Sequence, residues 1–162
     1  MTSRYEVHVF KEYLKFSAAH FICYPGFREA LHGHNYQVSV RIEGALGRDG
    51  YVLDFGRVKA AVKEICAELD EKVILPAKSD CLRVAEQGGS VTAVYEDGSA
   101  FSFPKADVVL LPIAHSSAEE LAQYLLGRLR GAMPDLVERG AATLEVGVAE
   151  APGQVAYCRE PL

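Results

Sequence analysis

The stretch LHGHNYQVSVRIE, residues 31–43, decides the fold of this 162-residue chain. From Tyr36 onward, apolar residues occupy every second position as far as Ile42. Successive side chains of a strand project to opposite faces, so an apolar residue at every second position marks one buried face. The pattern therefore predicts a half-buried β-strand over 34–43.

Two of the five histidines of the chain, His32 and His34, flank a glycine at the start of this strand. Residues i and i+2 of a strand point to the same side, with Cα atoms roughly 6.6 Å apart, and two such imidazoles can bind one metal ion at about 2.0–2.1 Å. An isolated H-x-H pair is also common as ordinary surface or core histidines. His20, at the end of the preceding strand in FSAAHF, would face the same space if the two strands pair. Three histidines without a fourth protein ligand are typical of a catalytic zinc site.

Composition and charge limit the classes of function. The chain is most simply one domain, 1–162, with 49% hydrophobic residues, 24% charged residues and a net charge of −5. It has no basic run, so we expect no nucleic-acid partner. It has neither an apolar stretch near the roughly 20 residues that span a bilayer nor a secretory signal, so we expect no membrane partner and a cytoplasmic location. The four cysteines are scattered without a C-x-x-C motif, which favours reduced thiols.

The remaining elements predict an α+β fold. Strands are expected over 4–17 and, as a pair around Ala-Pro-Gly, over 142–158. Amphipathic helices are expected over about 55–71 and 116–131. The segment 76–112 is less regular and contains a hairpin signal, EDGS. The order β-β-α-(hairpin)-α-β-β predicts a four-stranded antiparallel sheet with two helices on one face.

Six segments occur in order along the chain: FSAAH, LHGHNY, LDFGRVK, the LD that ends the first helix, SSAEELAQYL and VAEAPGQVAYC. Together they resemble the 6-pyruvoyl-tetrahydropterin synthase and 6-carboxytetrahydropterin synthase family, over most of the chain except an insertion at about 77–107. The resemblance implies the tunnelling fold and a trimer or dimer of trimers, whose sheets close into a barrel with sites at subunit interfaces. It also implies zinc on His20, His32 and His34, and a pterin substrate derived from 7,8-dihydroneopterin triphosphate.

The resemblance also implies residues for substrate binding. A pterin offers two parallel donors, its 2-amino group and N3–H, and one carboxylate can accept both. Glu150 in VAEAPG matches the family's pterin-binding glutamate, although alone it could be a surface carboxylate at a strand end. Ser116 and Ser117 match helix-start residues that border the pterin through main-chain groups, and they would also cap the helix. Arg28 suits the triphosphate through its guanidinium fork, or is a solvated loop arginine.

The chain departs from the family pattern at the catalytic residues. Where family members carry a cysteine four residues before H-G-H, this chain has Arg28, and where they carry a histidine after Asp70 it has Glu71. Glu29, in E-x-x-H-G-H, is therefore predicted to replace the cysteine as the acid/base group. Such a variant would cleave the side chain to give 6-hydroxymethyl-7,8-dihydropterin. The products 6-carboxytetrahydropterin and 6-pyruvoyl-tetrahydropterin stay open.

Three further residues are weaker catalytic candidates. Cys23 lies in the loop before Glu29, but a buried cysteine is usually packing. Asp70 could relay protons or be a surface residue at a helix end. His115 could replace the missing histidine in space or be a solvated helix-start residue. The two missing groups also leave a second hypothesis, a zinc-containing pterin-binding protein with an altered substrate or no catalysis.

Overall fold

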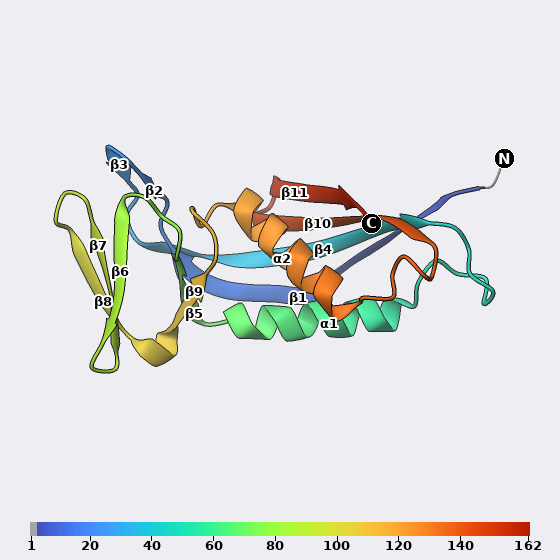
Figure 1. The fold of residues 1–162 in the computed structure, drawn as a ribbon, viewed down its shortest axis with the longest axis horizontal. Helices are drawn as coiled ribbons and strands as arrows, with labels where there is room; N and C mark the ends of the chain where they lie inside the picture. The colour runs from blue at the N-terminus through green and yellow to red at the C-terminus, as the bar shows by residue number, and fades with distance from the viewer. Residues whose placement is uncertain (1–2) are drawn as a thin grey trace.

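The computed structural model describes residues 3–162, and among them there is no helix of the length and apolarity needed to cross a membrane. The elements, in chain order, are β1 (Tyr5–His20), β2 (Cys23–Tyr24), β3 (Phe27–Arg28), β4 (His32–Gly44), α1 (Phe55–Leu69), β5 (Lys72–Pro76), β6 (Leu82–Gln87), β7 (Ser90–Tyr95), β8 (Ala100–Pro104), a 3-10 turn (Lys105–Asp107), β9 (Val108–Leu111), α2 (Ala118–Ala132), β10 (Ala141–Ala151) and β11 (Gln154–Pro161). Both helices lie along one face of a long sheet (Figure 1).

The predicted α+β class is confirmed. Strands β11, β10, β4 and β1 form the expected antiparallel sheet. The sheet is larger than predicted, because β5 pairs in parallel with β1, and β9 pairs in parallel with β5. Both added strands are short apolar runs, KVILP and VVLL. In such runs apolar and polar residues do not alternate, so the sequence pattern alone does not show that they are strands or with which strand they pair.

The segment between β5 and β9 forms a separate sheet in the order β6-β7-β8. The hairpin expected around EDGS is the β7–β8 pair. The third strand, β6, was not predicted, and it joins β7 through a turn at Gly88 and Gly89. Both glycines have positive φ, 57° and 83°, which suits a tight turn and which other residues rarely adopt. Figure 1 shows this sheet at the end of the molecule that also carries β2 and β3.

A β-bulge in β1 sets which side chains face the helices. The β1–β4 register shifts between Phe10 and Lys15. Before the shift, the odd-numbered Val9 is buried under the helices, and after it the even-numbered Phe16 and His20 are buried. Between these two pairs β1 has three more residues than β4, because residues 11–14 lie opposite residue 38 alone. An odd number of extra residues reverses the alternation of a strand, so the bulge places His20 on the helix-covered face.

Candidate metal centre and active site

Three histidines meet where β1 ends and β4 begins, on the helix-covered face. His20 lies directly opposite His32 in the β1–β4 register, and His34 lies opposite Ala18. The ring centroids are 4.7 Å apart for His20–His32, 5.2 Å for His20–His34 and 4.9 Å for His32–His34. One ligand nitrogen from each ring lies within 4.8 Å of the others. Small side-chain rotations would bring these nitrogens to the spacing of a tetrahedral metal site.

The hydrogen bonds of His20 and His32 fit metal ligands. Nδ1 of His20 lies 2.8 Å from the carbonyl oxygen of Ser116, and its buried Nε2 has no hydrogen-bond partner among residues 3–162. Nδ1 of His32 lies 2.8 Å from the carbonyl oxygen of Ala30. Ligating histidines usually donate their second N–H in this way, which leaves the other nitrogen for the metal. Burial lowers the pKa of His20 to about 4, so its ring is neutral, as a metal ligand must be.

The start of α2 packs against this cluster. Ser116 is fully buried, and its Oγ donates to the carbonyl of Phe21 at 3.1 Å. Ser117 is the N-cap, since its Oγ accepts the N–H of Glu120 at 3.3 Å. His115 Nδ1 lies 2.9 Å from Glu120 Oε1. Ser117 therefore caps this helix as expected, whereas Ser116 does not. His115 lies before the helix and is held by a carboxylate of its first turn.

Tyr36 lies beside the histidines on the same face of β4. Its side chain is fully buried, and its hydroxyl has no hydrogen-bond partner in the described part of the chain, residues 3–162. Its ring centroid is 5.8 Å from that of His20 and 5.4 Å from that of His34. The alternation of the strand predicts only a core position for Tyr36. Its place beside the histidines could have been found from its spacing, because a residue two positions after His34 lies on the same face of the strand.

Two carboxylates border the same region. In the β4–β10 register Gln37 lies opposite Ala149, so Tyr36 lies beside Glu150. Burial raises the pKa of Tyr36, and the charges of Glu150 and then of Glu29 raise it further. The charge of Glu29 also raises the pKa of His20, although burial lowers that pKa by more. The charge of Glu29 therefore acts on both Tyr36 and His20, and that of Glu150 acts on Tyr36.

A pocket of about 750 Å³ opens at this end of the sheet. His34 and Glu150 both line it, together with Pro152 and Gly153 of the turn between β10 and β11. Its volume is within the usual range for pockets that bind small molecules. The pocket thus joins a metal-ligand candidate to the carboxylate expected to bind the pterin.

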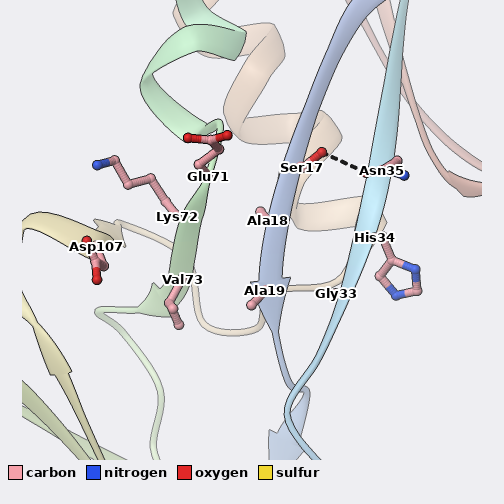
Figure 2. Close-up of a pocket in the computed structure, with 10 residues that line it drawn as sticks. All are labelled: Ser17, Ala18, Ala19, Gly33, His34, Asn35, Glu71, Lys72, Val73 and Asp107. Atoms are coloured by element: carbon pink, nitrogen blue, oxygen red, sulfur yellow. Dashed lines mark hydrogen bonds between the residues drawn. The ribbon is translucent and has the colours of Figure 1, made fainter.

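A second hollow, of about 490 Å³, lies over β5, β1 and β4. Figure 2 shows the ring of His34 pointing away from Glu71 and Lys72, and a hydrogen bond between Ser17 and Asn35. Glu71 lines this second hollow.

The other predicted residues have structural partners. Asp70 is exposed where α1 ends, and its Oδ1 accepts the N–H of Ser17 at 2.7 Å. Cys23 is buried in a hydrophobic cluster, where burial raises the pKa of its thiol to about 12. The guanidinium carbon of Arg28 lies 5.2 Å from the ring centroid of Phe101. Their proposed roles as proton relay, catalytic thiol and phosphate ligand stay predictions.

The chain was compared with known proteins. A profile of the family described as 6-pyruvoyl tetrahydropterin synthase matches residues 9–161. A relative from Methanocaldococcus jannaschii, provisionally named as a 6-carboxy-5,6,7,8-tetrahydropterin synthase, is 35% identical over 150 residues, which is 92% of this chain and 91% of the relative.

Two solved structures are similar over nearly the whole chain. The 6-pyruvoyl tetrahydropterin synthase of Plasmodium falciparum has a TM-score of 0.97 and 42% identity, and the match covers 99% of this chain and 100% of the other. A variant of the Plasmodium vivax 6-pyruvoyltetrahydropterin synthase, in which a catalytic glutamate is replaced by alanine, has a TM-score of 0.96 and 41% identity, with 99% of each chain covered. This chain belongs to the 6-pyruvoyl tetrahydropterin synthase family.

Proposed function

We propose that this protein is a zinc-dependent lyase that acts on the side chain of 7,8-dihydroneopterin triphosphate or a close pterin analogue. One observation carries the proposal. Three histidines whose ligand nitrogens lie within 4.8 Å of one another share one end of the sheet with the carboxylates Glu29 and Glu150. A metal site, an acid/base group and a group that can bind a flat nitrogen-rich ring are thereby in one place.

His20, His32 and His34 would hold the zinc ion. The unpartnered Nε2 of His20 supports this assignment, because a buried polar atom without a partner is unfavourable unless a ligand binds it. When bound, zinc would supply Lewis-acid polarisation of the substrate's side-chain hydroxyls. The carbonyls of Ser116 and Ala30 would keep two of the rings in orientation.

Glu150 would bind the pterin. Its carboxylate would accept hydrogen bonds from the 2-amino group and from N3–H, a paired geometry that fixes the ring in its plane. Main-chain groups at Ser116 and Ser117 would border the ring, because this helix start packs on the histidine cluster. Arg28 would bind phosphate through the N–H groups that remain after Nη1 has donated to the carbonyl of Glu29.

Glu29 would be the acid/base group. It would take the proton from the hydroxyl on the second side-chain carbon, and the bond between the first and second carbons would break. The electron pair of that bond would pass into the dihydropterin ring, and the second carbon would leave as an aldehyde that carries the phosphates. Glu29 would then return the proton to the first carbon, which gives 6-hydroxymethyl-7,8-dihydropterin.

Two observations support Glu29 over Cys23. The thiol of Cys23 has a pKa raised to about 12 by burial, so it would rarely form the reactive thiolate. The Plasmodium vivax enzyme has a glutamate described as catalytic. The names of other relatives point to 6-carboxytetrahydropterin or 6-pyruvoyl-tetrahydropterin as alternative products, and the three products differ in mass.

The active form would be a trimer or a dimer of trimers of one-domain subunits. Strand β11 lies at one edge of the sheet, and β1 pairs with β5 only at Ala18 and Ala19 within the described residues 3–162. Along the edge of β1 that faces away from β4, most backbone groups are therefore unpaired within these residues. Strand edges of this kind pair readily with another copy. Such pairing would close the sheets into a barrel.

The test is turnover by the zinc-loaded protein, with products identified by mass spectrometry. We expect turnover of dihydroneopterin triphosphate that falls at least 100-fold in Glu29→Gln, since acid/base groups contribute about 10²–10⁴-fold. Cys23→Ala is the matched control and should keep its activity. Tight pterin binding without turnover would favour the second hypothesis, a pterin-binding protein without catalysis. Absence of both binding and turnover would contradict both functions.

A further inference from the structure

Glu29 ends a short loop that begins at Phe21, here called the Glu29 loop (residues 21–29). The N–H of Glu29 donates to the carbonyl of Ile22 at 2.9 Å, and the N–H of Ile22 donates to Glu29 Oε2 at 2.9 Å. Between them, β2 and β3 pair as a two-stranded hairpin. The position of the Glu29 carboxylate therefore depends on where this hairpin sits.

The turn between β7 and β8 binds the far end of this loop. The N–H of Gly26 donates to Glu96 Oε1 at 2.6 Å. The hydroxyl of Tyr95 lies 3.0 Å from the carbonyl oxygen of Tyr24 and 3.0 Å from Glu96 Oε1, so one hydroxyl and one carboxylate hold two backbone groups of the loop. Gly26 has φ +85° and nothing within 4 Å of an added Cβ, so glycine is needed there for its backbone conformation and not for space.

Phe101 of β8 contacts both ends of the Glu29 loop. Its ring stacks on Phe21, with centroids 4.8 Å apart and planes inclined by 25°. The guanidinium carbon of Arg28 lies over the same Phe101 ring, 5.2 Å from its centroid. Nη1 of Arg28 also donates to the carbonyl of Glu29 at 2.8 Å. A chain of direct contacts thus runs from Phe101 through Arg28 to Glu29.

The buried side of the loop belongs to the core of the β6–β7–β8 sheet. Phe21 and Cys23 are 1% and 2% exposed, in a cluster separate from the main core under the helices. The other buried members of this cluster are Leu75, Cys81, Leu82, Val91, Ala93 and Tyr95. Since four of these eight residues lie in β6 and β7, the buried side of the loop packs against that small sheet.

We propose that the β6–β7–β8 sheet positions Glu29 for proton transfer, with Phe101, Tyr95 and Glu96 as positioning residues. This inference rests on the proposed function, because it assumes that Glu29 acts on the substrate. Each of the three residues contacts the Glu29 loop, Phe101 through its ring and Tyr95 and Glu96 through hydrogen bonds. They set where the Glu29 loop lies, and small errors in the placement of a reacting group can cost large factors in rate.

The test compares Phe101→Leu with Phe101→Tyr, which keeps the aromatic ring. We expect Phe101→Leu to lower kcat about tenfold with KM nearly unchanged, and to increase hydrogen–deuterium exchange in residues 22–29. Phe101→Tyr should have the kcat of the wild type and the same exchange in residues 22–29. Tyr95→Phe, a milder variant that keeps the packing, should shift both readouts in the same direction by a smaller factor. Glu86→Ala is the control, because Glu86 lies in β6 of the same sheet and pairs with Lys105 of the 3-10 turn, not with the loop.

The outcomes separate this inference from the function beneath it. If Glu29→Gln is inactive while Phe101→Leu and Tyr95→Phe match the wild type in kcat and exchange, the positioning role is overturned and the proposed function stands. A fall in kcat equally large in Glu86→Ala would also overturn it, because the effect would then be general destabilisation. Wild-type turnover in Glu29→Gln would contradict the proposed function, and the inference would fall with it.

Discussion

Replacing Ser116 with alanine would remove one buried hydroxyl and keep the backbone carbonyl that holds His20. The Ser116 side chain is fully buried, its Oγ donates to the carbonyl of Phe21 at 3.1 Å, and it lies 3.2 Å from Nδ1 of His20. Alanine would leave the Phe21 carbonyl without this donor. An unsatisfied buried acceptor costs about 1–3 kcal/mol, so the free energy of unfolding of the metal-free protein should fall by that amount.

Zinc affinity should change much less in the same variant. Nδ1 of His20 would still donate to the Ser116 carbonyl at 2.8 Å, so the ring would keep its orientation. Loss of a whole outer-shell partner typically costs about 10–100-fold in affinity, and loss of the hydroxyl alone should cost about tenfold at most. Urea unfolding measures the stability, and competition with a chelator measures the affinity.

Ser117→Ala is the matched control for Ser116→Ala. It removes the N-cap of α2 and should cost about 1 kcal/mol of stability with no change in zinc affinity. If Ser116→Ala is as stable as the wild type, the buried hydrogen bond to the Phe21 carbonyl does not stabilise the fold and the prediction is wrong. It is also refuted if that variant loses more than 100-fold in zinc affinity, since the carbonyl would then not be the group that orients the ring.

Three further predictions concern stability. Tyr36→Phe should leave the unfolding free energy of the metal-free protein unchanged or raise it by about 1 kcal/mol, because the lost hydroxyl has no partner within residues 3–162; a loss above 1 kcal/mol in urea unfolding would reveal a hydrogen bond. Hydrogen bonds from Arg57 and Arg139 hold the pKa of Asp135 well below its usual value of about 3.9. This carboxylate therefore stabilises the fold above about pH 4 and progressively less below it. Asp135→Asn should have a lower free energy of unfolding than the wild type at pH 7, and the difference should become smaller at pH 3. A difference that does not change with pH would contradict this. Free zinc at 1,000 times its Kd should add about 4 kcal/mol to the stability of the wild type and much less to that of His34→Ala; equal gains in a thermal melt would place the metal elsewhere.

Several parts of the fold followed from local patterns. The strand that contains Tyr36 alternates cleanly, and its helix-facing residues Val38, Val40 and Ile42 are all buried as expected. The meeting of His20 with the H-G-H pair could be predicted because two antiparallel neighbours bring their ends together. The bulge in β1 could not be located from the sequence, because both faces of that strand carry large side chains.

Contacts between distant segments explain most of what the sequence did not show. Arg28 was read as a phosphate ligand from its place in the loop, and its contact with Phe101 depends on two segments more than 70 residues apart. No periodicity in either segment signals that contact. The same holds for the pairing of β5 with β9, since both are short apolar runs that could equally have been loops.

The proposed function depends above all on three imidazoles that bind one zinc ion where β1 ends and β4 begins. X-ray absorption at the zinc edge, on protein loaded with one equivalent of zinc, tests it most directly. We expect three imidazole nitrogens at about 2.0–2.1 Å, with a nitrogen or oxygen ligand in the remaining position. A sulfur ligand at about 2.3 Å, or a spectrum left unchanged by His20→Ala, would contradict it.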